Sequence, residues 1–99
     1  MGDPSAAVDQ SAVILKALAD PSRLRLIRLL AQQGHALCVS ALARQLGISQ
    51  PAVSQHLRVL YHLGLVQRER RGYRVHYSLN RGRLAECRAV VDRVLRSDE

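Results

Sequence analysis

The segment from Gln50 to Leu63 carries polar side chains at spacings that would place them on one face of a helix. At about 100° per residue, the apolar residues fall on one arc: Val53, Leu57, Leu60 and Leu63. The opposite arc includes Ser54, Gln55 and Arg58, with Gln50 flanking it. His56 lies beside the apolar arc and is expected to be hydrogen-bonded at the core edge. Amides pair with adenine edges, and arginine pairs with guanine or phosphate. Because the N-terminal half of such a helix usually contacts bases, we expect base contacts from Gln50, Ser54 and Gln55 and a phosphate contact from Arg58.

A second set of cations surrounds Gly72. It consists of Arg68, Arg70, Arg71 and Arg74, opposed only by Glu69. Four guanidinium groups around a tight turn repel one another unless a polyanion neutralises them. We therefore expect this turn to contact the sugar-phosphate backbone or the minor groove of double-stranded DNA, and Arg44 to supply a further phosphate contact.

Two cysteines and one histidine could respond to a thiol-reactive compound. A soft ion such as As(III) or Cd(II) takes about two to four thiolate or imidazole ligands, which Cys38, Cys87 and His35 could supply if the fold or a dimer brings them together. Alternatively, the two thiols could form a disulfide or polysulfide bridge if their Cα atoms approach within about 7 Å. A third interpretation is that Cys87 is a small buried hydrophobic residue and Cys38 a spare thiol.

Composition and charge restrict the classes of protein. The chain has 99 residues, of which 47% are apolar and 23% charged, and its net charge is +7, with arginine as fourteen of its fifteen basic residues. Arginine is favoured for bidentate phosphate contact, so a polyanionic partner is expected. No membrane-spanning stretch, secretory signal, paired carboxylates, metal triad or phosphate-cradling glycine loop is evident in the sequence. We therefore expect a cytoplasmic protein that is not an enzyme and does not contact a membrane.

Two helices separated by a short break form the centre of the expected fold. Residues 1–10 are expected to be a flexible arm, and residues 11–18 a short helix covered on two sides. Asp20 and Pro21 have the residue types that begin a helix. A further short helix is expected over about 39–46. A three-residue turn from Gly47 to Ser49 then separates it from the helix over about 50–63, which predicts a helix-turn-helix.

After Gly64 the hydrophobic period changes to that of a strand. The alternating apolar residues are Tyr73, Val75, Tyr77 and Leu79, as expected for a half-buried strand. A preceding strand can pair with this one through a turn at Gly72, giving a wing over about 66–78. A last helix is expected over 81–96. The pattern predicts a mostly α chain with a small β-hairpin: a winged helix-turn-helix of about five helices plus wing, in one domain over residues 11–96.

The first and last helices have broad apolar faces. These faces comprise Ile14, Leu15, Leu18, Leu84, Cys87, Val91, Val94 and Leu95. The two helices could simply close the core of one chain. We favour a homodimer formed through them, since a groove-binding protein of this size gains affinity by contacting two half-sites about 34–36 Å apart.

With these motifs, the chain resembles the ArsR/SmtB family of winged-helix repressors. The resemblance covers residues 12–96 and is carried by KALADPSRLRLIRLL (16–30), LCVSALARQLGISQPAVSQHLRVLYHLGLV (37–66) and RRGYRVHYSL (70–79). It implies a homodimer built through the first and last helices that binds an operator and is released when a signal is sensed. Members of the family typically repress genes for metal efflux, arsenic detoxification or sulfur and redox stress. Two metal-binding features of the family are missing. Where many members have two cysteines, this chain has Cys38-Val39-Ser40. Where zinc-sensing members place Asp and His ligands, it has Arg81, Arg83 and Val94.

The function expected from the sequence is therefore a dimeric repressor that binds operator DNA and is released by a thiol-reactive signal. Two alternatives remain open: a winged-helix regulator without thiol sensing, and a protein-interaction module whose arginines bind an acidic partner.

Overall fold

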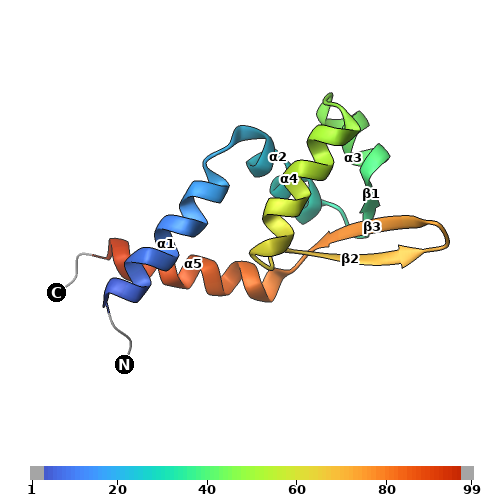
Figure 1. Ribbon diagram of the computed structural model, residues 1–99. Helices are drawn as coiled ribbons and strands as arrows, with labels where there is room; N and C mark the ends of the chain where they lie inside the picture. Colours follow the sequence, from blue (N-terminus) through green and yellow to red (C-terminus); the bar gives the residue numbers. More distant parts are fainter. Residues whose placement is uncertain (1–3, 97–99) are drawn as a thin grey trace.

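Five helices and a three-stranded antiparallel sheet make up residues 4–96, which the computed structural model describes (Figure 1). The helices are α1 (Pro4–Leu18), α2 (Pro21–Gln32), α3 (Val39–Leu46), α4 (Gln50–His62) and α5 (Arg81–Leu95). The strands are β1 (Leu37–Cys38), β2 (Val66–Arg71) and β3 (Arg74–Leu79). Helices α1 and α5 pack together at one end of the molecule, and the hairpin of β2 and β3 extends at the other. The mostly helical fold with a small β-hairpin is confirmed.

Helix α1 begins earlier than the apolar pattern indicated. The expected flexible arm over residues 1–10 is wrong for residues 4–10, which are the first turns of α1, and residues 1–3 lie outside the described residues. Proline suits the first helical position, and alanine, found at Ala6 and Ala7, is the strongest helix former. Ser11 is buried, and its Oγ donates a hydrogen bond of 3.5 Å to the Val90 carbonyl of α5. Packing against α5 therefore stabilises a helix longer than its apolar stretch.

Helix α2 begins at the cap that the sequence predicts. The Asp20 carboxylate accepts hydrogen bonds from the backbone N–H groups of Ser22 (2.8 Å) and Arg23 (3.3 Å). Apolar side chains of α2, α3, α4 and the turn between α4 and β2 form the centre of the core. The largest fully buried ones are Leu26, Leu42, Leu57, Leu60 and Leu65.

The turn between α3 and α4 depends on two residues. Gly47 has a φ of 69°, in the left-handed region that favours glycine, and its N–H donates to the Ala43 carbonyl (2.9 Å) at the end of α3. Ser49 then begins α4, because its Oγ accepts a hydrogen bond from the Ala52 N–H (3.2 Å). The helix-turn-helix expected from the sequence is therefore present.

The wing is a regular hairpin with an additional short strand at its edge. Strands β2 and β3 pair in antiparallel register from Val66↔Leu79 to Arg71↔Arg74, and Gly72 in the turn has a φ of 67°. The sheet order is β1-β3-β2, with Cys38 of β1 opposite His76 of β3. The sequence did not predict β1. Its pairing places Cys38 beside the wing.

Among the residues the structure describes, none of the helices combines the length and apolar character that crossing a bilayer requires.

Candidate nucleic-acid interface

Helix α4 exposes the polar face that its sequence predicts. Val53, Leu57 and Leu60 are buried in the core, which fixes the rotation of the helix about its axis. The predicted contact residues of this helix are all exposed: Gln50, Ser54, Gln55 and Arg58. Arg44, in the last turn of α3, is exposed as well. The face of α4 turned away from the core therefore offers amide, hydroxyl and guanidinium groups.

His56 connects α4 to the helices behind it. The Arg23 side chain donates from Nε to Nδ1 of His56 (3.2 Å) and from Nη1 to the Ala17 carbonyl near the end of α1 (3.0 Å). His56 is partly buried and accepts this bond, so the interpretation of it as a hydrogen-bonded residue at the core edge is confirmed. One guanidinium group thus joins α1, α2 and α4.

The wing presents its cations to solvent. Its four arginines are all exposed: Arg68, Arg70, Arg71 and Arg74. One of them is already paired, because Nη2 of Arg71 lies 3.2 Å from Oε1 of Glu69. The wing therefore carries an excess of positive charge that its single carboxylate offsets only in part.

The tip of the wing corrects one expectation. The alternating pattern included Tyr73 in a half-buried strand, but Tyr73 lies in the turn after Gly72 and is 87% exposed. Turn residues extend beyond the last strand pair, so alternation does not apply to them. The Arg74 guanidinium carbon lies 5.8 Å from the centre of the Tyr73 ring. The exposed tip is thus aromatic as well as cationic.

The wing lies beside α4 near both ends of the helix. Near the start of α4, Gln50 and Arg74 line the same shallow pocket. Near the end of α4, the Arg68 guanidinium carbon lies 4.0 Å from the centre of the Tyr61 ring, a cation–π arrangement. Wing arginines therefore lie near both ends of α4, and Arg68 contacts the helix at Tyr61. The contact of Arg68 with Tyr61 could not be predicted from the sequence, because the two residues come from different elements.

Cys38 has the environment of a reactive thiol. It lines the same pocket as Gln50 and Arg74, and its Sγ lies 3.3 Å from the Ser40 hydroxyl. Hydrogen bonds from Ser40 and the Ala41 backbone, together with the Arg74 guanidinium, lower the pKa of the Cys38 thiol to about 7. A substantial fraction of Cys38 is therefore thiolate near neutral pH.

The three expected sensing residues do not form one site in this chain. Cys87 is only 2% exposed and lies in α5 against α1, His35 lies in the loop before β1, and both cysteines are free. Cys38 and Cys87 line different pockets. Within residues 4–96, no group of three or more His, Cys, Asp or Glu side chains is arranged to hold a metal ion. Within the described residues of one chain the structure therefore shows neither a shared metal site nor a disulfide, because Cys38 belongs to the sheet edge and Cys87 to the helix pair.

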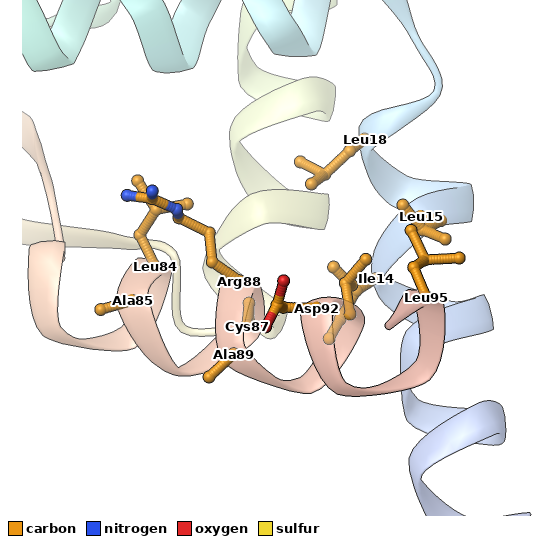
Figure 2. A pocket seen from close by; sticks show the side chains of 11 residues that line it. Ile14, Leu15, Leu18, Leu84, Ala85, Cys87, Arg88, Ala89, Asp92 and Leu95 are labelled. Carbon is orange, nitrogen blue, oxygen red and sulfur yellow. The ribbon is translucent and has the colours of Figure 1, made fainter. Parts of the chain in front are cut away.

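An apolar groove lies between α1 and α5. Figure 2 shows side chains of both helices around it, with Ile14, Leu15 and Leu95 close together where the end of α5 meets α1. Ile14 and Cys87 are buried and help to close the core, whereas Leu15 (46%) and Leu95 (70%) remain exposed. All the expected interface residues except Val94 line this groove. Closing the core of one chain therefore leaves part of this apolar surface uncovered.

These features define a winged helix-turn-helix protein, with two helices joined by a tight turn and followed by a cationic β-hairpin. Residues 20–68 match the sequence model described as bacterial regulatory protein, arsR family. A transcriptional repressor SmtB homolog from Synechocystis is 44% identical over 90 residues, which cover 90% of this chain and 67% of that repressor. The arsenical resistance operon repressor of Escherichia coli K12 is 36% identical, covering 87% of this chain and 73% of that protein.

A solved structure has the same arrangement of elements. The solution structure of a homodimeric winged helix-turn-helix DNA-binding domain from Mycobacterium bovis has a TM-score of 0.72 and 31% identity. The match covers 97% of this chain and 91% of the Mycobacterium bovis domain. The chain therefore belongs to the arsR family of bacterial regulatory proteins, as its sequence motifs indicated. This family consists of transcriptional regulators and not of enzymes.

Proposed function

We propose that this protein is a dimeric transcriptional repressor that binds double-stranded operator DNA through α4 and the wing. The observation that carries the proposal is the position of the wing beside α4: the Arg68 guanidinium lies over the Tyr61 ring at one end, and Arg74 and Gln50 line one pocket at the other. This position supports treating the polar face of α4 and the cationic hairpin as one interface. A helix in the major groove with a basic wing beside it is the arrangement that such a surface fits.

Within this interface the residue types indicate which side chains contact bases and which contact phosphates. Gln50, Ser54 and Gln55 lie in the first half of α4 and are exposed, so they are assigned to base edges. The guanidinium groups are assigned to phosphates, and they belong to Arg44, Arg58, Arg68, Arg70, Arg71 and Arg74. Phosphate contacts determine affinity and its salt dependence, whereas base contacts determine sequence preference.

The proposed dimer forms through the groove between α1 and α5. Leu15 and Leu95 leave apolar area exposed there, and a second copy would remove that area from water. The similar domain from Mycobacterium bovis is described as homodimeric. A two-fold dimer would present two α4 helices to two half-sites, so the expected operator is an inverted repeat.

The proposed effector acts at Cys38. A thiol with a pKa of about 7, in the pocket shared by Gln50 and Arg74, is placed where an adduct would disturb the DNA-binding residues. Arsenite, Cd(II) and an organic persulfide are the compounds expected to react there. No group of such donors within residues 4–96 makes a metal site, so a soft ion held at Cys38 requires ligands beyond these described residues, such as those of a second copy.

DNA binding is tested by selecting duplexes from a random pool and measuring fluorescence anisotropy with the selected and random sequences. Gln55→Ala is expected to change the preferred sequence, whereas Arg71→Ala weakens binding to every duplex and reduces the salt dependence. Arg93→Ala, at an exposed position of α5, is the matched control for loss of one charge. Feeble affinity for all duplexes even at low salt would contradict the proposal and favour a module that binds an acidic protein.

The effector assignment is tested by DNA release on addition of arsenite, cadmium or an organic persulfide. We expect the wild type and Cys87→Ser to release DNA with at least one compound and Cys38→Ser to remain bound. A wild type that ignores all three compounds would identify a regulator without thiol sensing.

A further inference from the structure

The end of α4 and the start of the wing share a contact in which one partner, Tyr61, has no role assigned in the proposed DNA interface. Tyr61 is a large side chain in the last turn of α4, yet it is 37% exposed. Arg68 of β2 places its guanidinium carbon 4.0 Å from the centre of the Tyr61 ring. The residues are joined by the short turn through Gly64, which connects α4 to β2 (Figure 1). The stack therefore connects α4 and the wing, the two elements proposed to contact DNA.

The geometry of a stacked guanidinium leaves its hydrogen-bonding capacity free. The Arg68 guanidinium carbon lies over the Tyr61 ring, and none of the described hydrogen bonds or ion pairs uses its five N–H donors. Among the described ion pairs, Arg71 is paired with Glu69, whereas Arg68 is paired with no carboxylate. Stacking thus restricts the orientation of Arg68 without occupying its donors.

A second cation lies close by on α4. Arg58 is one helical turn before Tyr61, so the two side chains are neighbours on the helix surface, and Arg58 is exposed. The ring of Tyr61 therefore has a guanidinium group stacked on it from the wing and another on the adjacent turn of α4. Two cations on adjoining elements, one of them restrained, make a suitable site for a backbone phosphate.

We propose that Tyr61 is a positioning residue, which holds the Arg68 guanidinium at the end of α4 so that it contacts a DNA backbone phosphate together with Arg58. This inference rests on the proposed function, since it assigns a role within the same DNA interface. In the free protein, Tyr61 reduces the freedom that Arg68 loses on binding. The stack also fixes the wing relative to α4.

The test uses Tyr61→Phe, Tyr61→Leu, Arg68→Ala and the double variant Tyr61→Leu/Arg68→Ala, with Arg93→Ala, in the last turn of α5, as the charge control. Affinity for a selected duplex is measured over a range of salt concentrations. Tyr61→Leu is expected to weaken binding by about 2- to 5-fold, the range of an exposed cation–π contact. Arg68→Ala should reduce the salt slope by about 0.9, the value for one phosphate. In the Arg68→Ala background, Tyr61→Leu should have no further effect, because its partner is gone.

The conservative variant separates positioning from a direct contact. Tyr61→Phe keeps the ring face and should bind like the wild type, whereas a loss equal to that of Tyr61→Leu would assign the effect to the hydroxyl group and overturn the inference. Additive losses in the double variant would also overturn it. A thermal unfolding scan of each variant confirms that the compared proteins are folded.

A measurement without DNA separates the stack from the proposed function. Ring currents should shift the δ-CH₂ protons of Arg68 upfield in the NMR spectrum of the free wild type, and Tyr61→Leu should abolish the shift. Absence of the shift would overturn the positioning role even if the protein binds DNA. A wild type that shows the shift but binds no duplex would instead refute the proposed function and, with it, the phosphate contact.

Discussion

Glu69 is the single acidic residue of the wing, and replacing it with glutamine should strengthen DNA binding. Its Oε1 lies 3.2 Å from Nη2 of Arg71, one of the arginines assigned to phosphate. DNA binding would therefore break or share this pair and bring the carboxylate near the backbone. Glu69→Gln removes the charge with almost no change in shape.

The magnitude of the effect follows from the exposure of the pair. Both side chains are exposed, and such ion pairs contribute about 0.2–1 kcal/mol. Releasing Arg71 from Glu69 should therefore increase affinity by about 1.5- to 5-fold. If Arg71 then neutralises one further phosphate, the salt slope should steepen by about 0.9. The free energy of unfolding should change by less than about 0.5 kcal/mol, as expected at the surface.

The assay is fluorescence anisotropy with a selected duplex and a random duplex, because a phosphate effect should strengthen both equally. Glu86→Gln is the matched control, since Glu86 forms an exposed pair of the same length with Arg83 on α5. That variant should bind DNA like the wild type. Unchanged or weaker binding by Glu69→Gln, or an equal gain for Glu86→Gln, would refute the assignment of Arg71 to phosphate.

Three further predictions concern the core, the dimer and the thiol. Leu57→Ala, at a position 1% exposed, should lower the free energy of unfolding in urea by about 2–5 kcal/mol; a loss under about 1 kcal/mol would place Leu57 outside the core. Leu15→Glu should leave the chain folded but monomeric in light scattering, because it puts a charge in the proposed interface; an intact dimer would move the interface elsewhere. Alkylation of Cys38 by iodoacetamide should be half-maximal at about pH 7 and slow at lower pH, since only the thiolate reacts. Ser40→Ala should move this midpoint to higher pH, and an unchanged midpoint would contradict the Ser40 hydrogen bond as its cause.

Local features predicted most of the fold. Asp20 and Pro21 indicated the start of α2, Gly47 the turn before α4, and Gly72 the turn of the wing, because each acts on neighbouring backbone groups. The apolar spacing of α4 also predicted which of its residues are exposed, since burial of one face determines the other. The polar face of the candidate interface therefore follows from the sequence.

Features that depend on distant residues were not predicted. Strand β1 has two residues, too few to show a period, and it forms by pairing with β3 almost forty positions later. That pairing sets the surroundings of Cys38, so the separation of Cys38 from Cys87 could not be derived from spacing. The stack of Arg68 on Tyr61 likewise depends on the angle between the wing and α4.

The most direct test of the DNA interface is the mapping of backbone amide shifts in NMR spectra on addition of a selected duplex. We predict that the largest changes fall on the first half of α4, around Ser54 and Gln55, and on the wing from residue 68 to residue 74. The groove between α1 and α5 should show little change. Large changes in that groove, with none at Ser54 or Gln55, would contradict the proposed interface.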